Sequence, residues 1–266
     1  MKIVGVIPSR YGSSRFPGKP LADICGKPML WWVYNQAIKV NQFDEIYVAT
    51  DDERILSCCK ELEIPCLLTS REHINGTERV AEVAEKIVAD IFITMQGDEP
   101  LMEPFNIEKI INLMISDSDI QCATLKTAYH DPVDVINSTT PKVVSDLQGN
   151  VMLFTRSPVP YPKSSLNYKI FKPMGLYGFR KNALLSYRGL KIGPVEKAED
   201  IELLRFIENG IKVRIIETES KTIAVDTPKD LEKVRMIISR GERERLKLNF
   251  TYATANYPIL NPARCC

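Results

Sequence analysis

Residues 1–30, MKIVGVIPSRYGSSRFPGKPLADICGKPML, begin with a short apolar run that Pro8 ends, and a segment rich in glycine, serine, proline and basic residues follows. The run over residues 2–7 predicts a buried first strand. Residues 9–27 predict a loop, and apolar residues return with helical spacing over residues 30–40. The chain therefore opens with strand, loop and helix in succession.

The same alternation continues along the first half of the chain. It predicts strands over residues 45–49, 65–68 and 91–95, and helices over residues 53–62, 77–88 and 104–114. Such alternation is typical of an α/β fold with parallel strands joined by right-handed crossovers. Ligands bind beyond the carboxyl ends of such strands. The loop at 9–27, the pair Asp51 and Asp52, and the segment 96–98 should therefore share one rim.

The second half has a mixed pattern. Strands are predicted over residues 121–127, 142–145, 151–155, 170–179 and 212–216, with some antiparallel pairing, and helices over 196–208 and 227–238. The helical pattern breaks at Ser239. We therefore expect one domain over residues 1–240, with halves 1–120 and 121–240, and a C-terminal appendage of uncertain order over residues 241–266.

The composition excludes several classes of protein. The net charge is +1, so no overall field attracts nucleic acid or a membrane surface. No apolar run is long enough to span a bilayer, and the first residues turn polar too early for a signal peptide. The seven scattered cysteines indicate reduced thiols in a cytoplasmic protein. Zinc is not expected, since His73 and His130 are the two histidines, and surface positions are expected for both.

Three basic residues mark the loop at 9–27 as a candidate phosphate site. Arg10, Arg15 and Lys19 lie among glycines and serines, and a triphosphate needs cations together with closely approaching backbone N–H groups. Neither a Walker loop nor a dinucleotide fingerprint is present. From composition alone, a solvated surface loop is an equally good interpretation.

Two aspartates are candidate metal ligands. Asp98 follows a predicted strand within MQGDEP, where a carboxylate facing a basic loop suits Mg²⁺. Asp226 lies in AVDTP before a predicted helix. Each could instead cap the turn or helix that follows, and for Asp226 the position by itself favours the cap. Glu99, next to Asp98, is an alternative metal ligand.

Eight motifs follow one another along the chain: IPSRYGSSRFPGKPLADICGKPML, ATDDERI, HINGTERVAEV, MQGDEPLM, TRSPVPY, GLYGFRK, EDIELLRFIENGIKV and VDTPKDLEKV. Taken together, these motifs resemble the 3-deoxy-manno-octulosonate cytidylyltransferase family over about residues 1–240, whereas the tail has no recognised counterpart. The resemblance implies a Rossmann-like nucleotidyltransferase fold, similar to the GT-A fold. A mixed sheet would be flanked by helices, with a smaller mixed α/β lobe for the acceptor and for dimerisation.

The resemblance also implies a reaction and the residues that serve it. CMP would pass from CTP to the anomeric hydroxyl of a 2-keto-3-deoxy sugar acid with release of pyrophosphate, in a cytoplasmic homodimer that makes precursors of surface polysaccharide. Mg²⁺ would be held by Asp98 and Asp226, and catalysis would also use Arg10 and Lys19. The nucleotide would contact Pro8, Arg10, Ser13, Arg15, Lys19, Asn75, Gly76, Thr77, Arg79 and Gln96.

The departures from the family pattern lie on the sugar side. Met174 replaces a histidine and Leu203 replaces a glutamine, and loss of polar contacts to a sugar can change specificity strongly. The change at Met174 could equally be a packing substitution. The sugar-side candidates are Arg156, Ser157, Met174, Tyr177, Glu199, Glu202, Leu203 and Arg205.

Other functions compete with this one. The acceptor could be an amino-octulosonate or a nonulosonate, and the nucleotide could be UTP or GTP. A non-catalytic nucleotide sensor is a rival from another class, but it need not keep both Asp98 and Asp226. A glycosyltransferase is possible from the fold alone, although such enzymes typically carry a DxD motif.

Overall fold

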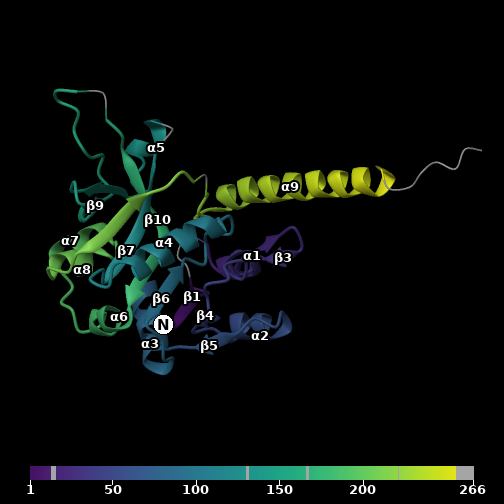
Figure 1. Cartoon of the computed structure of the whole chain (residues 1–266), viewed down its shortest axis with the longest axis horizontal. Helices are drawn as coiled ribbons and strands as arrows, with labels where there is room; N and C mark the ends of the chain where they lie inside the picture. Colours follow the sequence, from purple (N-terminus) through teal and green to yellow (C-terminus); the bar gives the residue numbers. More distant parts are fainter. Residues whose placement is uncertain (13–15, 130–131, 166–167, 221, 256–266) are drawn as a thin grey trace, which may run out of the picture.

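The computed structural model describes residues 1–12, 16–129, 132–165, 168–220 and 222–255, and for 132 and 242–255 it describes the backbone alone. The predicted site residues Ser13 and Arg15, and His130, lie outside the described residues. Figure 1 shows a central sheet with helices on both faces and one long helix projecting from the body.

The sheet is mixed, with the strand order β11-β7-β10-β6-β1-β4-β5, and β8 and β9 join it beside β10. Strands β6, β1, β4 and β5 are parallel to one another, whereas β10 runs antiparallel to β6 and β7. The bounds are β1 (Ile3–Ser9), β4 (Glu45–Thr50), β5 (Cys66–Leu68), β6 (Ile91–Met95), β7 (Cys122–Ala128), β8 (Lys142–Ser145), β9 (Val151–Thr155), β10 (Phe171–Arg180) and β11 (Val213–Glu217). The predicted combination of a parallel first half and a mixed second half is confirmed.

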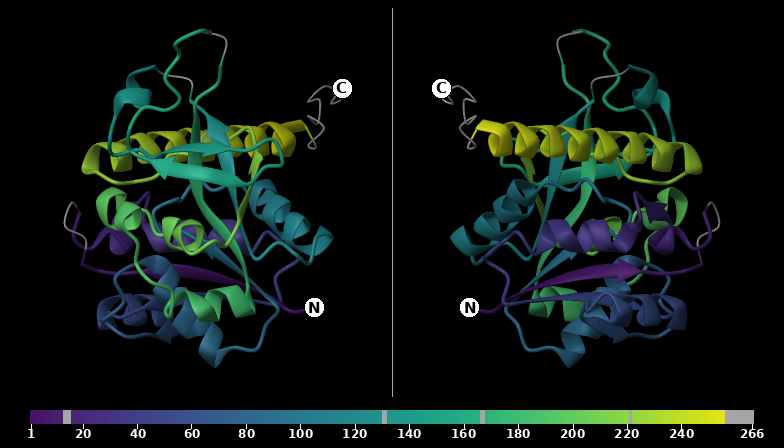
Figure 2. Two further views of the ribbon diagram at one scale, coloured as in Figure 1. Left: turned by 90° about the vertical axis from the view of Figure 1, so that its left-hand side faces the viewer. Right: turned by 90° about the vertical axis from the view of Figure 1, so that its right-hand side faces the viewer.

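The helices form two layers that bury the two faces of the sheet (Figures 1 and 2). Helices α1 (Met29–Ala37), α2 (Glu53–Glu61) and α4 (Pro104–Ser116) pack on one face. Helices α3 (Gly76–Lys86), α6 (Lys181–Tyr187) and α8 (Leu204–Glu208) pack on the other. Strand β6 is buried along its whole length because both faces are covered.

Short elements complete the chain between these layers. A 3-10 turn η1 (Lys19–Leu21) and the small hairpin of β2 (Asp23–Ile24) and β3 (Lys27–Pro28) lie within the segment that the sequence predicts as a loop. Helix α5 (Pro132–Ile136) precedes β8. The side chains of Ile24 and Met29 pack under the start of the last helix, which ties the first loop to the C-terminal part of the chain.

The helix predicted over residues 196–208 is wrong as one element. It consists of α7 (Pro194–Glu199) and α8, because Asp200 adopts the left-handed conformation with φ +52° and ends α7. The break has a structural consequence. It frees residues 200–203 from the helix, so that the carboxylate of Glu202 can bond to groups on α3 and after β6.

The last helix, α9 (Pro228–Ala255), is longer than expected and continues past Ser239, where the sequence pattern breaks. The segment GERERLKL is rich in residues with high helix propensity, and one glycine is tolerated in such a run. In Figure 1 this helix extends away from the body. Within the described part of the chain, no helix is both long and apolar enough to cross a membrane.

Candidate active site

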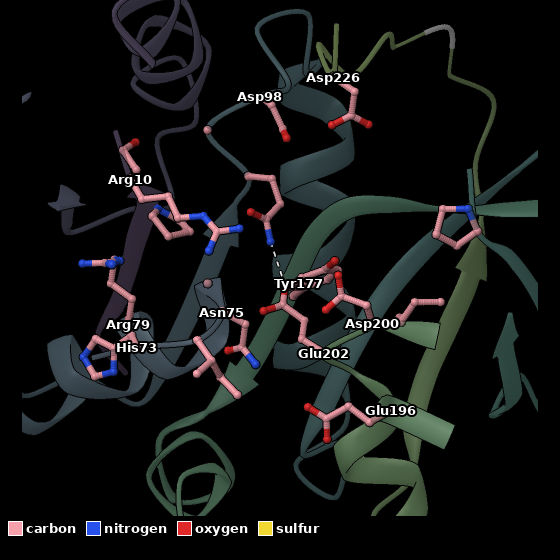
Figure 3. Close-up of a pocket in the computed structure, with 18 of the residues that line it drawn as sticks. Arg10, His73, Asn75, Arg79, Asp98, Tyr177, Glu196, Asp200, Glu202 and Asp226 are labelled. Carbon is pink, nitrogen blue, oxygen red and sulfur yellow. Dashed lines mark hydrogen bonds between the residues drawn. The ribbon is translucent and has the colours of Figure 1, made fainter. Parts of the chain in front are cut away.

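A cavity of about 580 Å³ opens beyond the carboxyl ends of β1 and β6 and is closed on its far side by residues of α7 and the turn after it. Figure 3 shows Arg10, Asp98 and Asp226 at one end and Glu196, Asp200 and Glu202 at the other. Twelve predicted site residues line it: Pro8, Arg10, Lys19, Asn75, Gly76, Arg79, Gln96, Asp98, Arg156, Tyr177, Glu202 and Asp226.

Six other predicted residues, all of them described, do not line the cavity: Thr77, Ser157, Met174, Glu199, Leu203 and Arg205. Thr77 is fully buried in α3, and the Glu199 carboxylate turns away to bond with Thr155 and the backbone of Arg156. Met174 and Leu203 are 2% and 1% exposed and belong to the two hydrophobic cores. Both departures from the family pattern therefore lie in packed interiors, and their predicted contact with the sugar has no support from this geometry.

Lys19 joins the two predicted metal ligands. Its ammonium nitrogen lies 2.7 Å from Asp98 Oδ2 and 3.5 Å from Asp226 Oδ1. Asp98 comes from the turn after β6 and Asp226 from the segment before α9, and the backbone N–H of Val225 donates to the Asp98 carbonyl at 2.8 Å. That backbone bond fixes the two carboxylates side by side. Among the described residues, no group of three or more His, Cys, Asp or Glu side chains could hold a metal ion. Asp98 and Asp226 alone therefore do not enclose a metal site.

The cap of α9 is Thr227, which removes the competing role suggested for Asp226. The Asp230 N–H donates to Thr227 Oγ1 at 3.3 Å, and the Thr227 N–H donates to Asp230 Oδ2 at 3.1 Å. This reciprocal pair is a capping box without Asp226. The Asp226 carboxylate can therefore serve the cavity.

The N-terminus of α3 forms the wall beside the phosphate end. Asn75 caps this helix by accepting a hydrogen bond from the Glu78 N–H at 2.9 Å. The Arg79 guanidinium donates to Thr69 Oγ1 and lies 3.4 Å from Asp51 Oδ1. Asp51 and Asp52 were expected on the cavity rim, but neither lines the cavity. Asp51 instead contacts Arg79, which does.

Glu202 links the two ends of the cavity. Its carboxylate accepts hydrogen bonds from the Thr77 N–H at 2.8 Å and from Gln96 Nε2 at 2.9 Å. Burial raises the pKa of Glu202 above its usual value, in opposition to those two bonds. Burial likewise raises the pKa of Tyr177 well above its usual value, so this phenol stays protonated and can donate.

Arg156 lines the cavity, but its guanidinium is largely engaged. It donates to the backbone carbonyls of Ser138, Thr139, Glu199 and Asp200 at 2.7–3.3 Å. These bonds tie the loop before β8 to the end of α7. Arg156 thus shapes the acceptor end of the cavity more than it offers free donors.

Buried charge supports the wall at the acceptor end. The Arg205 guanidinium, whose side chain is 1% exposed, lies 2.7 Å from Glu196 Oε1 and 2.8 Å from Glu78 Oε1. The surface position expected for His73 is wrong: the residue is buried, and its Nε2 lies 2.5 Å from Glu82 Oε2. In the sequence, the one indication that His73 lies near the site was its place at the start of the motif HINGTERVAEV.

Several cavity residues were missed by sequence reasoning. Pro141, Ile192, Lys197, Asp200 and Ile201 also line the acceptor end. They come from loops and from the break between α7 and α8, where neither helical nor strand periodicity gives a signal. The proximity of Asp200 and Ile201 to the predicted Glu199 and Glu202 was the one available hint.

A cavity at the carboxyl ends of parallel strands, with cations beside a pair of carboxylates, defines a nucleotidyltransferase. The pattern of the family described as Cytidylyltransferase matches residues 4–220. The chain belongs to that family.

Named relatives and solved structures agree with this assignment. The chain is 42% identical to the 3-deoxy-manno-octulosonate cytidylyltransferase of Solibacter usitatus over 88% of this chain and 93% of the relative. It is 40% identical to the one from Escherichia coli over 90% and 97%. A solved CMP:2-keto-3-deoxy-manno-octonic acid synthetase complexed with CTP superposes with a TM-score of 0.86 and 40% identity, over 91% of this chain and all of that one. A putative glucose-1-phosphate thymidylyltransferase from Bacillus anthracis shares the fold at 13% identity, with a TM-score of 0.63 over 89% of this chain and 94% of that one.

Proposed function

We propose that the protein transfers CMP from CTP to 3-deoxy-manno-octulosonate and releases pyrophosphate. The observation that carries the proposal is the meeting of Arg10, Lys19 and the pair Asp98 and Asp226 at one end of the cavity. Cations placed in this way suit a triphosphate. The relatives named above act on this acceptor by name, and the solved relative is complexed with CTP.

The reaction is a direct displacement at phosphorus. The anomeric hydroxyl oxygen forms a bond to the α-phosphorus while the bond from that phosphorus to the oxygen bridging to the β-phosphate breaks. Pyrophosphate leaves with the electron pair, and the hydroxyl proton passes to solvent. Arg10 and Lys19 hold the phosphates in line and offset the charge that grows on pyrophosphate, so positioning and electrostatics supply most of the rate.

Mg²⁺ is the proposed cofactor, and Asp98 and Asp226 would hold it. The residues fit such an ion, since two hard carboxylates already share one cation, the Lys19 ammonium. Mg²⁺ needs few protein carboxylates and takes its other ligands from phosphates and water. When bound, it supplies positive charge that neutralises phosphate oxygens and polarises the acceptor hydroxyl.

The acceptor is proposed to lie between Tyr177, Glu202 and the loop that Arg156 holds. The buried positions of Met174 and Leu203 favour the family's acceptor over a modified analogue, because neither substitution alters the described cavity surface. An amino-octulosonate or nonulosonate acceptor is the alternative and belongs in the same assay.

A cytoplasmic homodimer that supplies surface polysaccharide synthesis completes the proposal. The support for dimerisation is apolar surface on the acceptor half. Val133 and Ile136 on α5 and Met152 on β9 are 67%, 71% and 62% exposed. Large apolar side chains left exposed on this half are candidates for a protein interface. Light scattering coupled to size-exclusion chromatography tests this part directly.

Pyrophosphate release tests the central claim. The assay combines CTP, Mg²⁺ and one of three acceptors: 3-deoxy-manno-octulosonate, its 8-amino analogue or a nonulosonate. Asp98→Asn serves as the inactive control, and UTP and GTP replace CTP in parallel wells. Release with CTP and 3-deoxy-manno-octulosonate that disappears in the control is the expected result. A folded protein that binds CTP but transfers to a different acceptor overturns the acceptor, and one that binds no CTP overturns the function.

A further inference from the structure

A polar contact outside the cavity lies beside Tyr11, which belongs to the predicted phosphate-binding segment over residues 9–27 that we call the phosphate loop. Asp52 follows β4 and caps α2 by accepting a hydrogen bond from the Arg54 N–H at 2.9 Å. The same carboxylate binds the Arg54 guanidinium twice, through Nε at 2.9 Å and Nη2 at 2.7 Å. The hydrogen bond to Arg54 holds the pKa of Asp52 below its usual value. The guanidinium plane is thereby fixed on the surface of α2.

Arg54 covers the ring of Tyr11, with its guanidinium carbon 3.3 Å from the ring centroid. Guanidinium groups favour this arrangement, in which the plane lies over the face of an aromatic ring. Asp52, Arg54 and Tyr11 form what we call the α2 clamp. It connects the first turn of α2 to a residue adjacent to Arg10 in the phosphate loop.

The far end of the loop closes on the same tyrosine. The Gly18 N–H donates to the Tyr11 carbonyl at 2.9 Å, and Lys19 follows directly. Gly18 has φ +72°, and a Cβ atom there would lie 3.1 Å from the Tyr11 ring, so only glycine suits this position. Tyr11, which directly follows Arg10, therefore also holds Gly18, which directly precedes Lys19.

The clamp also lies beside the support of a third basic residue. Asp51, immediately before Asp52, has its Oδ1 3.4 Å from Arg79 Nη2, and Arg79 lines the cavity. Asp51 therefore contacts Arg79 directly, and Asp52 reaches the neighbours of Arg10 and Lys19 through Arg54 and Tyr11. Neither Asp51 nor Asp52 lines the described cavity.

We propose that Arg54, held by Asp52, is a positioning residue for CTP, and that it acts through Tyr11 to order Arg10 and Lys19 before the nucleotide arrives. The inference rests on the proposed function, since it presumes that this loop binds CTP. Ordering Arg10 and Lys19 in advance reduces the entropy lost on binding, so the clamp strengthens nucleotide affinity without touching the nucleotide. The acceptor end of the cavity lies apart from the clamp and is unaffected.

A double-mutant cycle tests the clamp. Arg54→Ala and Tyr11→Leu should each raise the Kd for CTP about 3- to 10-fold, as expected for loss of a cation–π contact and of part of the loop order. The KM for the acceptor should stay unchanged. The double variant should bind no more weakly than either single variant, because both changes break the same contact. Tyr11→Phe keeps the ring and should bind CTP within about twofold of the unchanged protein.

Further variants distinguish the positioning role of Arg54 from a general effect of its charge. Tyr11→Leu removes no charge, so weaker binding in it cannot result from losing a cation near the triphosphate. Arg188→Ala removes an exposed arginine that pairs with Glu85 on a distant surface, and it should leave the Kd unchanged. Arg54→Lys keeps the charge without the flat, two-bonded geometry and should behave like Arg54→Ala. It also supplies a test if the alanine variant fails to fold.

The result that overturns the proposal is CTP binding in Arg54→Ala and Tyr11→Leu equal to that of the unchanged protein. Additive losses in the double variant would equally overturn it, because the two side chains would then act separately. Failure of the proposed function looks different: the unchanged protein itself would bind no CTP by calorimetry. The two failures are therefore distinguishable in one series of titrations.

Discussion

The ammonium of Lys19 lies 2.7 Å from Asp98 Oδ2, in contact with the carboxylate proposed to bind Mg²⁺. It also lies 3.5 Å from Asp226 Oδ1, and its side chain is only 15% exposed. In this arrangement a protein cation neutralises the two carboxylates proposed to hold the metal. If they bind Mg²⁺, the ion would compete with Lys19 until the phosphates of CTP offered the ammonium another partner.

Replacement of Lys19 by methionine should strengthen Mg²⁺ binding in the absence of nucleotide. Removal of the competing ammonium should lower the Kd for the metal about tenfold, which corresponds to about 1.4 kcal/mol. The same variant should lose turnover, since the ammonium no longer offsets charge on pyrophosphate. Isothermal titration with Mg²⁺ alone measures the first effect without any need for activity.

Lys169→Met is the matched control for this titration, because Lys169 is an exposed lysine paired with Glu217 far from the cavity. It should not change the metal affinity. Equal Mg²⁺ affinities for Lys19→Met and the unchanged protein would show that Lys19 does not compete with the metal.

Asp98→Asn and Asp226→Asn should each lower kcat about 100-fold or more, while CTP binding in the absence of metal stays within a few-fold. Loss of a carboxylate weakens the metal that neutralises phosphate charge, and a hundredfold loss corresponds to about 2.7 kcal/mol. Asn is nearly isosteric with Asp, so folding should be preserved. Full activity in either variant would remove that residue from the proposed metal site.

The parallel half of the fold follows from the sequence because each of its elements has a clear period. Residues 91–95 are apolar except for Thr94 and form the buried strand β6, and the turn after it carries Asp98. Short segments at the carboxyl ends of such strands must meet at one edge. The phosphate end of the cavity, including Lys19 and Gln96, was predictable for that reason.

The acceptor end was less predictable, because tertiary contacts decide it. The sequence over residues 196–208 has a helical period, yet Asp200 breaks the helix and sends Glu202 to the Thr77 N–H and Gln96 Nε2. Arg156 was a predicted sugar ligand, but its donors bond to four backbone carbonyls from distant loops. No local pattern encodes either contact.

Glu202→Gln should make stability depend less on pH. Burial raises the folded-state pKa of Glu202 above its ordinary value of 4.5. The stabilisation from the protonated acid is complete below about pH 4.5 and is lost as the pH rises through the folded-state pKa. The free energy of unfolding of the variant relative to the unchanged protein should therefore rise between about pH 4.5 and neutral pH.

Urea unfolding of both proteins at a series of pH values measures this difference. Glu85→Gln is the control, since Glu85 is half-exposed and pairs with surface Arg188. A difference between Glu202→Gln and the unchanged protein that is constant with pH, or that falls as the pH rises, would contradict the raised pKa.

Arg205→Met should lower the free energy of unfolding by about 3–5 kcal/mol, because it leaves the buried Glu196 and the partly buried Glu78 without their cation. Arg188→Met removes an exposed pair of the same type and should cost at most about 1 kcal/mol. Adding Glu196→Gln to Arg205→Met should recover part of the loss, since one of the two stranded charges is then gone. Urea unfolding monitored by circular dichroism gives all three values. A loss for Arg205→Met no larger than that for Arg188→Met would mean that the buried cluster adds nothing to the wall of the acceptor site.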